Sequence, residues 1–270
     1  MEDRLQQILE SSRSGKICVL TGAGISAESG IPTFRGKEGY WVVGSRNYMP
    51  QEMATARMFT RQPEEVWRWY LYRFGLCRKF EPNPAHRALA QLEHSIDDRF
   101  RLVTQNIDGL HLRAGNSPQR TYAIHGDSTW MRCSGDCSGL VALPDFGQRD
   151  VTTPLGANER ERLTCPKCNQ WMRPHVLWFD ECYDEPLYRA ESALQAAAEA
   201  DLLIVVGTSG ATNLPSQIGA LCFRLGTPMI DVNPEPNPFS ELAARGRAGG
   251  ALRGPASELV PSIVEVLIHP

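Results

Sequence analysis

The sequence feature that most constrains the fold is a glycine-rich run at residues 21–36, TGAGISAESGIPTFRG. It follows a short apolar stretch at 17–20, which is typical of a buried parallel strand. Gly22-x-Gly24-x-x-Ala27 fits the fingerprint that holds a dinucleotide pyrophosphate at a helix N-terminus. Gly30 and Pro32 cut the following helix short, so the usual layout for hydride transfer is not kept. Because glycine turns after strands are often only tight turns, this run alone leaves a ligand undecided.

Apolar stretches alternate with helical patterns along most of the chain. We expect further strands at 101–104, 121–124, 202–206 and 228–233, the last of them being the final strand, and helices from 63, 85, 191 and 214, with a final helix that starts near Pro261. This alternation predicts an α/β fold with a doubly wound parallel sheet. Ligands bind such sheets at the carboxyl ends of strands, and polar or glycine residues stand there at 21–35, 105–108, 207–209 and 233–235.

Length and charge narrow the class of protein. A chain of 270 residues can bury a sizeable core, as one large domain or one domain with an insertion. The net charge of −3 gives no basic surface for direct nucleic-acid binding, and no apolar run approaches the ~20 residues of a membrane span. The acidic, amphipathic N-terminal segment does not resemble a signal peptide. We therefore expect a cytoplasmic protein that binds neither nucleic acid directly nor a membrane. The oligomeric state stays open, and a monomer is compatible with the sequence.

Four of the eight cysteines form two close pairs, separated by 27 residues. The pairs are Cys133 with Cys137 and Cys165 with Cys168. Two turns of this kind can set four thiolates in a tetrahedron, which predicts one structural zinc ion in a segment too poor in apolar residues to hold its own core. The alternatives are four unrelated cysteines or two disulfides, and disulfides fit a reducing compartment poorly. A site closed by four thiolates would serve folding rather than catalysis.

Two polar motifs follow predicted strands. The first, at 105–108, is Gln-Asn-Ile-Asp, in which Asp108 can cap the next helix while the backbone faces a ligand. The second is His125-Gly126. A lone histidine is more often structural than catalytic. The glycine behind His125 nevertheless sets its ring beside an open turn, where a general base is useful.

Taken in order, these segments resemble the sirtuins, which are NAD-dependent protein deacylases. The resemblance spans nearly the whole chain and rests on the 21–36 run, TQNIDGLH at 104–111, His125-Gly126, the four cysteines, RPHVLWFDE at 173–181, GTS at 207–209 and NPE at 233–235. The chain departs from the family pattern at three points. Asp180 replaces a glycine, the stretch 210–215 lacks the usual valine and Pro-Ala, and the first cysteine gap is one residue wider.

The resemblance implies an NAD-binding, Rossmann-like domain formed by 1–36, 84–129 and 176–270. A helical insertion at 37–83 and a zinc ribbon at 130–175 would form an inserted small domain. The implied reaction uses NAD as co-substrate and acyl-lysine proteins as substrates. The acyl oxygen attacks the nicotinamide ribose and nicotinamide leaves, after which His125 takes a proton from a ribose hydroxyl. Free lysine and O-acyl-ADP-ribose are the products.

The resemblance also implies the residues of the site. His125 and Asn106 would be catalytic. NAD would contact Gly22, Ala23, Gly24, Ser26, Phe34, Arg35, Gln105, Asn106, Ile107, Asp108, Gly207, Thr208, Ser209, Asn233, Glu235 and Ala256. The substrate peptide would pair with a strand at Val176, Leu177, Trp178 and Phe179.

Tyr70 and Arg73 resemble a pair found in the desuccinylase branch, class III. Positions i and i+3 share a helix face, where a phenol and a guanidinium can hold the far carboxylate of a succinyl chain. Thr33 in place of an aspartate, and Gly39-Tyr40-Trp41, support this interpretation. Spacing alone favours an ordinary amphipathic helix with Tyr70 in the core and Arg73 at the surface. We predict removal of succinyl, malonyl or glutaryl groups, and also of acetyl groups.

Two rival functions stay open. A protein mono-ADP-ribosyltransferase would use the same NAD pocket but a nucleophile other than acyl-lysine. A non-catalytic NAD- or zinc-binding module would need neither base nor ribose contact, and the presence of both His125 and Asn106 argues against it.

Overall fold

The structure is a computed structural model that describes residues 3–31 and 49–269. The interpretations that depend on Thr33, Phe34, Arg35 and 39–41, and the predicted domain boundary after residue 36, lie outside the described residues.

Six strands form one parallel sheet in the order β3-β2-β1-β7-β8-β9. They are β1 (Ile17–Thr21), β2 (Phe100–Thr104), β3 (Thr121–Ala123), β7 (Leu202–Val206), β8 (Met229–Val232) and β9 (Gly249–Leu252). The strand order reverses between β1 and β7, which is where ligands bind in doubly wound sheets. The predicted α/β fold with a doubly wound sheet is confirmed.

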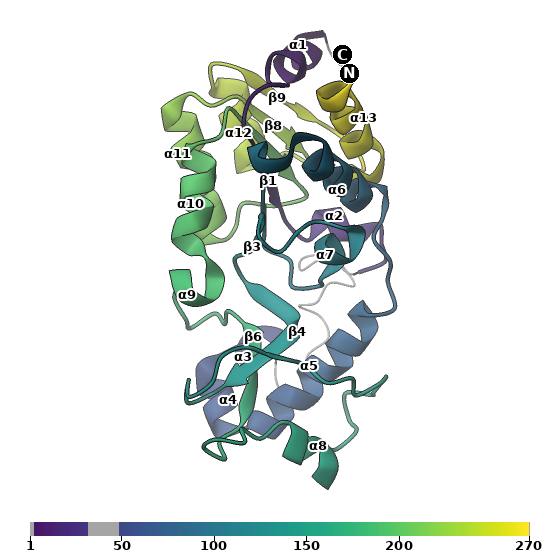
Figure 1. Ribbon diagram of the computed structural model, residues 1–270, viewed down its shortest axis with the longest axis vertical. Coiled ribbons are helices and arrows are strands. Elements are labelled where there is room, and N and C mark those ends of the chain that lie inside the picture. Colours follow the sequence, from purple (N-terminus) through teal and green to yellow (C-terminus); the bar gives the residue numbers. More distant parts are fainter. Residues whose placement is uncertain (1–2, 32–48, 270) are drawn as a thin grey trace.

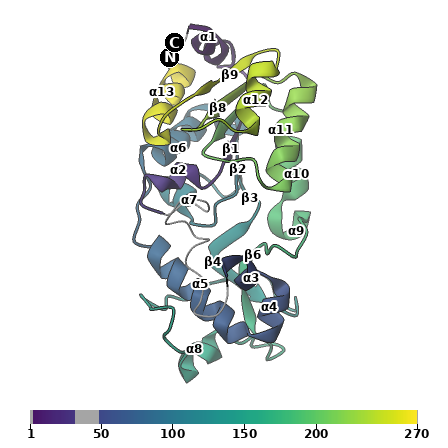
Figure 2. The same cartoon turned by 180° about the vertical axis from the view of Figure 1, so that it is seen from behind.

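Helices cover both faces of this sheet (Figures 1 and 2). One face carries α1 (Asp3–Ser11), α6 (Pro84–Ile96) and α13 (Ala256–Ile268), and the other carries α10 (Ala190–Ala198), α11 (Asn213–Leu225) and α12 (Pro238–Arg245). Alternate residues of β1 reach the two cores: Ile17 and Val19 pack with the first set of helices, Cys18 and Leu20 with the second. Within residues 3–31 and 49–269, no helix has the length and apolar character that a membrane span requires.

The C-terminal part of the chain corrects two predictions. The strand at 229–232 is not the last, because β9 follows it; this strand begins with two glycines and so lacks the β-branched composition that predicts a strand. The last helix starts at Ala256 rather than near Pro261, which lies inside it. Proline there removes one intrahelical hydrogen bond, and the buried face of α13, packed against α6, offsets that loss.

A second, three-stranded antiparallel sheet lies at the end of the molecule opposite the chain termini (Figure 1). Its strands are β4 (Gly126–Cys133), β5 (Val141–Ala142) and β6 (Met172–Val176), and it packs with α3 (Pro50–Met53), α4 (Ala56–Arg61) and α5 (Pro63–Cys77). Helix α8 (Ala157–Arg162) lies at the same end of the molecule (Figure 1). The indole N–H of Trp67 on α5 donates to the Met172 carbonyl at 2.7 Å, which joins this helix to β6. The remaining short helices are α2 (Gly24–Ala27), α7 (Leu110–Ala114), α9 (Glu185–Tyr188) and the 3-10 helix at Asp97–Arg99.

The predicted strand at 176–179 is wrong beyond Val176, where β6 ends. Trp178 turns into the core of the small sheet, with 2% of its surface exposed, and its amide donates to the Glu181 carboxylate at 2.9 Å. The strand thus ends because the Trp178 side chain is buried and its backbone amide bonds to the Glu181 side chain rather than to a neighbouring strand. The division into an NAD-binding domain and an inserted domain at 83/84, 129/130 and 175/176 stays a prediction.

Candidate active site

The turns after β1 and β7 press directly against each other. The amide of Gly22 donates to the Val206 carbonyl at 3.0 Å, and that of Gly24 to the Gly207 carbonyl at 2.8 Å. A Cβ atom on Gly24 would lie 2.6 Å from the Cα of Gly207, and Gly207 itself has a φ of +62°. Part of the glycine run is therefore required by contact between two backbones, at the point where the strand order reverses.

Ser26, Asn106 and Asp108 come together beside this contact. The Ser26 hydroxyl donates to Asp108 Oδ2 at 2.7 Å, and Asn106 Nδ2 donates to Ser26 Oγ and to the Gly22 carbonyl, both at 3.1 Å. Asp108 Oδ1 accepts from the Leu110 amide at 2.9 Å, so the expected helix cap and the site role coexist in one residue. Burial raises the pKa of Asp108.

Two buried histidines lie within hydrogen-bond distance of the hydroxyls of Thr21 and Ser26, beside the cluster of Ser26, Asn106 and Asp108. His111 Nε2 lies 3.0 Å from the Thr21 hydroxyl, and His86 Nε2 lies 3.3 Å from the Ser26 hydroxyl. Burial lowers the pKa of His86 to about 4 and that of His111 well below its usual range, so both rings are neutral near pH 7. Sequence reasoning did not assign them a role, although His111 closes the TQNIDGLH motif.

The side chain of Gln105 connects the end of β2 to the loop after β7. Its Nε2 donates to Thr208 Oγ1 at 2.8 Å, and its Oε1 accepts from Thr212 Oγ1 at 2.9 Å. Thr212 belongs to the 210–215 stretch, where the chain departs from the sirtuin pattern. This stretch therefore contacts a predicted NAD-binding residue.

His125 lies between β3 and β4, directly before Gly126, and both of its ring nitrogens have a hydrogen-bond partner. Nδ1 is 3.0 Å from the Gln105 carbonyl and Nε2 is 2.8 Å from the Tyr183 hydroxyl. Because a carbonyl only accepts hydrogen bonds, Nδ1 carries the proton and Nε2 has the lone pair of a base. Burial lowers the pKa of His125 to about 4, although the bond to Gln105 opposes this shift. The imidazole is neutral at pH 7, as a general base requires.

Four other predicted NAD contacts that the structure describes lie at the same edge of the sheet, after β7, β8 and β9: Ser209, Asn233, Glu235 and Ala256. Asn233 follows β8, and its Nδ2 donates to Oδ1 of Asp231. Oδ2 of Asp231 accepts from Nδ2 of Asn237 at 2.8 Å. The Glu235 carbonyl accepts from Arg253 at 2.8 Å. Ala256 is buried at the start of α13, and Ser209 is exposed after β7. Among the described residues, the structure thus groups Gly22, Gly24, Ser26, 105–108, Gly207 and Thr208 closely, and sets Ser209, Asn233, Glu235 and Ala256 along the neighbouring strands.

The four predicted metal ligands form one cluster. Sγ of Cys137 lies 3.4 Å from those of Cys133 and Cys165 and 3.3 Å from that of Cys168. All eight cysteines are free, and these distances far exceed the ~2.05 Å of a disulfide. Four thiolates at such spacing fit a tetrahedral zinc ion with Zn–S bonds of about 2.3 Å.

Tyr70 and Arg73 are both buried, with 3% and 9% of their surfaces exposed. The Tyr70 oxygen accepts from Trp178 Nε1 at 2.9 Å, and the Arg73 guanidinium stacks 4.2 Å from the centre of the Trp69 ring. Burial raises the pKa of Tyr70 to about 12, so the phenol keeps its proton. The surface position that spacing alone favours for Arg73 is therefore wrong.

Asp180, another of the departures from the family pattern, anchors the segment after β6. Its carboxylate accepts from the amides of Ala56 at 2.7 Å and Arg57 at 3.1 Å, the first residues of α4. The Phe179 amide donates to the Ala54 carbonyl at 3.0 Å. An acidic side chain at a helix N-terminus satisfies free N–H groups, which explains why aspartate suits this position.

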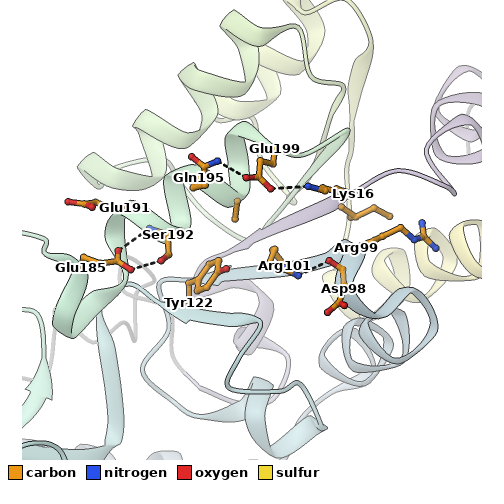
Figure 3. A pocket seen from close by; sticks show the side chains of 12 residues that line it. Lys16, Asp98, Arg99, Arg101, Tyr122, Glu185, Glu191, Ser192, Gln195 and Glu199 are labelled. Carbon is orange, nitrogen blue, oxygen red and sulfur yellow. Dashed lines mark hydrogen bonds and ion pairs between the residues drawn. The ribbon is translucent and has the colours of Figure 1, made fainter.

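A cavity of about 520 Å³ lies at the other edge of the large sheet, where β1 and β2 begin. Two of its acidic side chains already have partners: Lys16 pairs with Glu199 at 2.9 Å, and the Ser192 amide donates to Glu185 at 2.9 Å (Figure 3). None of the predicted site residues lines it. The convergence of strand ends, rather than this cavity, marks the candidate site.

Residues 22–213 match the Sir2 family. An NAD-dependent protein deacylase of Thermus thermophilus is 40% identical over 97% of this chain and 95% of its own length. An NAD-dependent protein deacylase of Leptospira interrogans serovar Lai is 38% identical over 94% of this chain and 94% of its own length. A crystal structure of a Sir2 homologue–NAD complex is similar with a TM-score of 0.80 and 33% identity, covering 99% of this chain and 94% of that one. A Sir2–p53 peptide–NAD⁺ structure is similar with a TM-score of 0.76 and 25% identity, covering 98% of this chain and 98% of that one.

Proposed function

Because this chain belongs to the Sir2 family and is an NAD-dependent protein deacylase, we propose that it removes acidic acyl groups from lysine, namely succinyl, malonyl or glutaryl, and accepts acetyl-lysine as well. The observation that carries the acidic preference is the burial of Tyr70 and Arg73 side by side on α5. A buried cation next to a protonated phenol favours an anion of matching size.

The donors of this pair suit a carboxylate. Tyr70 uses an oxygen lone pair to accept from Trp178, which leaves its own O–H to donate. A guanidinium that stacks on an indole through its face donates hydrogen bonds through its edge. The carboxylate at the end of a succinyl chain would accept from both, whereas an acetyl group has no charge there. Trp178, which belongs to the predicted peptide segment at 176–179, joins the pair to that segment through its bond to Tyr70.

We assign the chemistry to the residues around His125. NAD supplies an ADP-ribose group: the bond between its ribose and nicotinamide breaks, and a bond from the ribose to the acyl oxygen forms. Asn106, fixed by Gly22 and Ser26, orients the ribose and an ordered water. His125 accepts a ribose hydroxyl proton at Nε2, while Gln105 holds its Nδ1–H. Of the other predicted NAD contacts, Gly22, Ala23, Gly24 and Ser26 hold the phosphates, and Phe34 and Arg35 close over the ribose and a phosphate. Ile107 and Asp108 bind the carboxamide. The adenosine side is lined by Gly207, Thr208, Ser209, Asn233 and Glu235, with Ala256 near the adenine.

The four-cysteine cluster would hold zinc with no open ligand position, so its role is to fold the segment at 130–175. The eight free thiols support our prediction of a reducing, cytoplasmic location, and the net charge of −3 supports the absence of a direct nucleic-acid partner.

The test is a panel of acetyl-, succinyl-, malonyl- and glutaryl-lysine peptides with NAD. Mass spectrometry should find O-acyl-ADP-ribose, and kcat/KM should be higher for the acidic peptides. Arg73→Met should lower the succinyl-to-acetyl ratio by about tenfold or more, since a hydrogen-bonded charge pair is lost. Arg68→Met on the same helix, which removes the pair with Glu65, is the matched control and should leave the ratio unchanged.

An unchanged ratio in Arg73→Met would contradict the acidic preference but not the deacylase activity. The same spectra would reveal the alternative function, because a mono-ADP-ribosyltransferase adds ADP-ribose to a target protein and releases no acylated product.

A further inference from the structure

We propose that Tyr183 is a latch on His125, meaning a residue whose hydrogen bond covers the base and must break when the ribose of NAD binds. The proposal rests on the role of His125 given under the proposed function. It adds a positioning residue that the sequence motifs did not indicate.

The geometry of the pair defines which atom is covered. The Tyr183 hydroxyl lies 2.8 Å from His125 Nε2, while the ring centres are 5.8 Å apart, so the contact is made through the hydroxyl. His125 Nδ1 already donates to the Gln105 carbonyl. The Tyr183 O–H must therefore donate to the lone pair on Nε2.

That lone pair is the one that a general base uses. A neutral imidazole has a single unprotonated nitrogen, so Nε2 cannot accept fully from Tyr183 and from a ribose hydroxyl at the same time. Binding of the ribose in a productive position thus requires the Tyr183 bond to break. The lost bond reduces the apparent affinity for NAD.

Tyr183 is also linked to the loop beside the predicted NAD contacts. Burial raises the pKa of Tyr183 to about 12, while the Leu214 amide and the Thr212 side chain, which lie near its hydroxyl, lower this pKa by a smaller amount. Thr212 in turn donates to Gln105, which bonds Thr208. The hydroxyl therefore lies where α11 begins, and the latch connects His125 to the 210–215 stretch that departs from the family pattern.

The experiment compares the affinity for ADP-ribose of the wild type, Tyr183→Phe and Tyr188→Phe by calorimetry. ADP-ribose carries the competing ribose hydroxyls but does not react. Tyr183→Phe should bind about three- to tenfold more tightly, the worth of one neutral hydrogen bond. KM for NAD should fall by a similar factor with no loss of kcat. Tyr188 is buried in the same segment with its ring stacked on His175, so Tyr188→Phe controls for loss of a tyrosine hydroxyl.

Equal or weaker binding by a folded Tyr183→Phe variant would overturn the latch. If that variant does not fold, ¹⁵N NMR of histidine-labelled wild type decides, because the Nε2 resonance of His125 must shift when ADP-ribose replaces Tyr183. No shift in the saturated complex would also overturn it. Failure of the proposed function looks different: His125→Ala would then keep its deacylase activity, whatever the behaviour of Tyr183→Phe.

Discussion

The six-stranded and three-stranded sheets of this molecule are stabilised in different ways. All five residues of β1 and of β7 are buried, and apolar side chains from both faces fill two continuous cores. Around the small sheet, β5 has two exposed residues, and the buried side chains include Arg132 and Arg173. Both regions bury apolar side chains, but the small sheet adds specific interactions to its hydrophobic cluster: metal ligands, ion pairs and cations over indoles.

Zinc removal should separate the two regions most clearly. Chelation or Cys165→Ala should unfold β4–β6 and abolish deacylation, because structural zinc contributes about 10 kcal/mol or more of apparent binding free energy. Hydrogen exchange should show lost protection in β4 and β6 and retained protection in β1 and β7. Cys182→Ala, an exposed cysteine outside the cluster, is the control. Active, folded protein that contains no zinc would show that the cluster has another role.

The next largest effect should come from the junction of the regions. His125→Ala should reduce kcat/KM for deacylation by about 10²–10⁴-fold, the usual contribution of a general base. Its zinc content and circular dichroism should equal those of the wild type, since the imidazole of His125 is bonded only to Gln105 and Tyr183 among the described residues. Wild-type rates in this variant would remove His125 from the mechanism.

Ion pairs should matter more near the small sheet than on the large one. Glu181→Gln breaks a pair between the buried Arg173 and the partly buried Glu181. It should lower the free energy of unfolding by about 3 kcal/mol, because the charge of Arg173 is left uncompensated. Lys16→Met removes the exposed pair with Glu199 and should cost less than about 1 kcal/mol. Urea denaturation measures both. Equal costs would contradict the contrast between the two sheets.

Acid should weaken both regions more gradually. His86 on α6 and His175 in the small sheet have pKa values lowered to about 4 by burial. At these two positions the unfolded chain therefore binds more protons than the folded one below pH 6.5. The free energy of unfolding should fall as pH drops from 6.5 to 4, by about 1.4 kcal/mol per pH unit for each such histidine. Unfolding curves at fixed ionic strength check this, and a flat profile would contradict it.

The sequence predicted what depends on periodicity and spacing. Apolar runs located β1, β2, β7 and β8, and the cysteine gaps located the metal cluster. Elements without such a signal were missed or misplaced: β9 begins with glycines, and α13 contains Pro261.

Single long-range contacts were also beyond prediction. The bond from Tyr183 to His125 joins residues 58 positions apart, and Asp180 receives the amides of a helix 123 and 124 positions earlier. No local pattern encodes contacts of this kind, because they arise only when distant segments meet.

The close approach of Gly24 to Gly207 has a consequence for variation in this protein. A methyl group on Gly24 would lie 2.6 Å from the Cα of Gly207, and one on Gly207 would lie 2.4 Å from the Ile25 nitrogen. Neither glycine can therefore be exchanged alone without pushing the two turns apart, and repair would require a compensating shift in both segments. Attempts to enlarge the dinucleotide pocket by protein engineering should begin by treating these two distant positions as one unit of design.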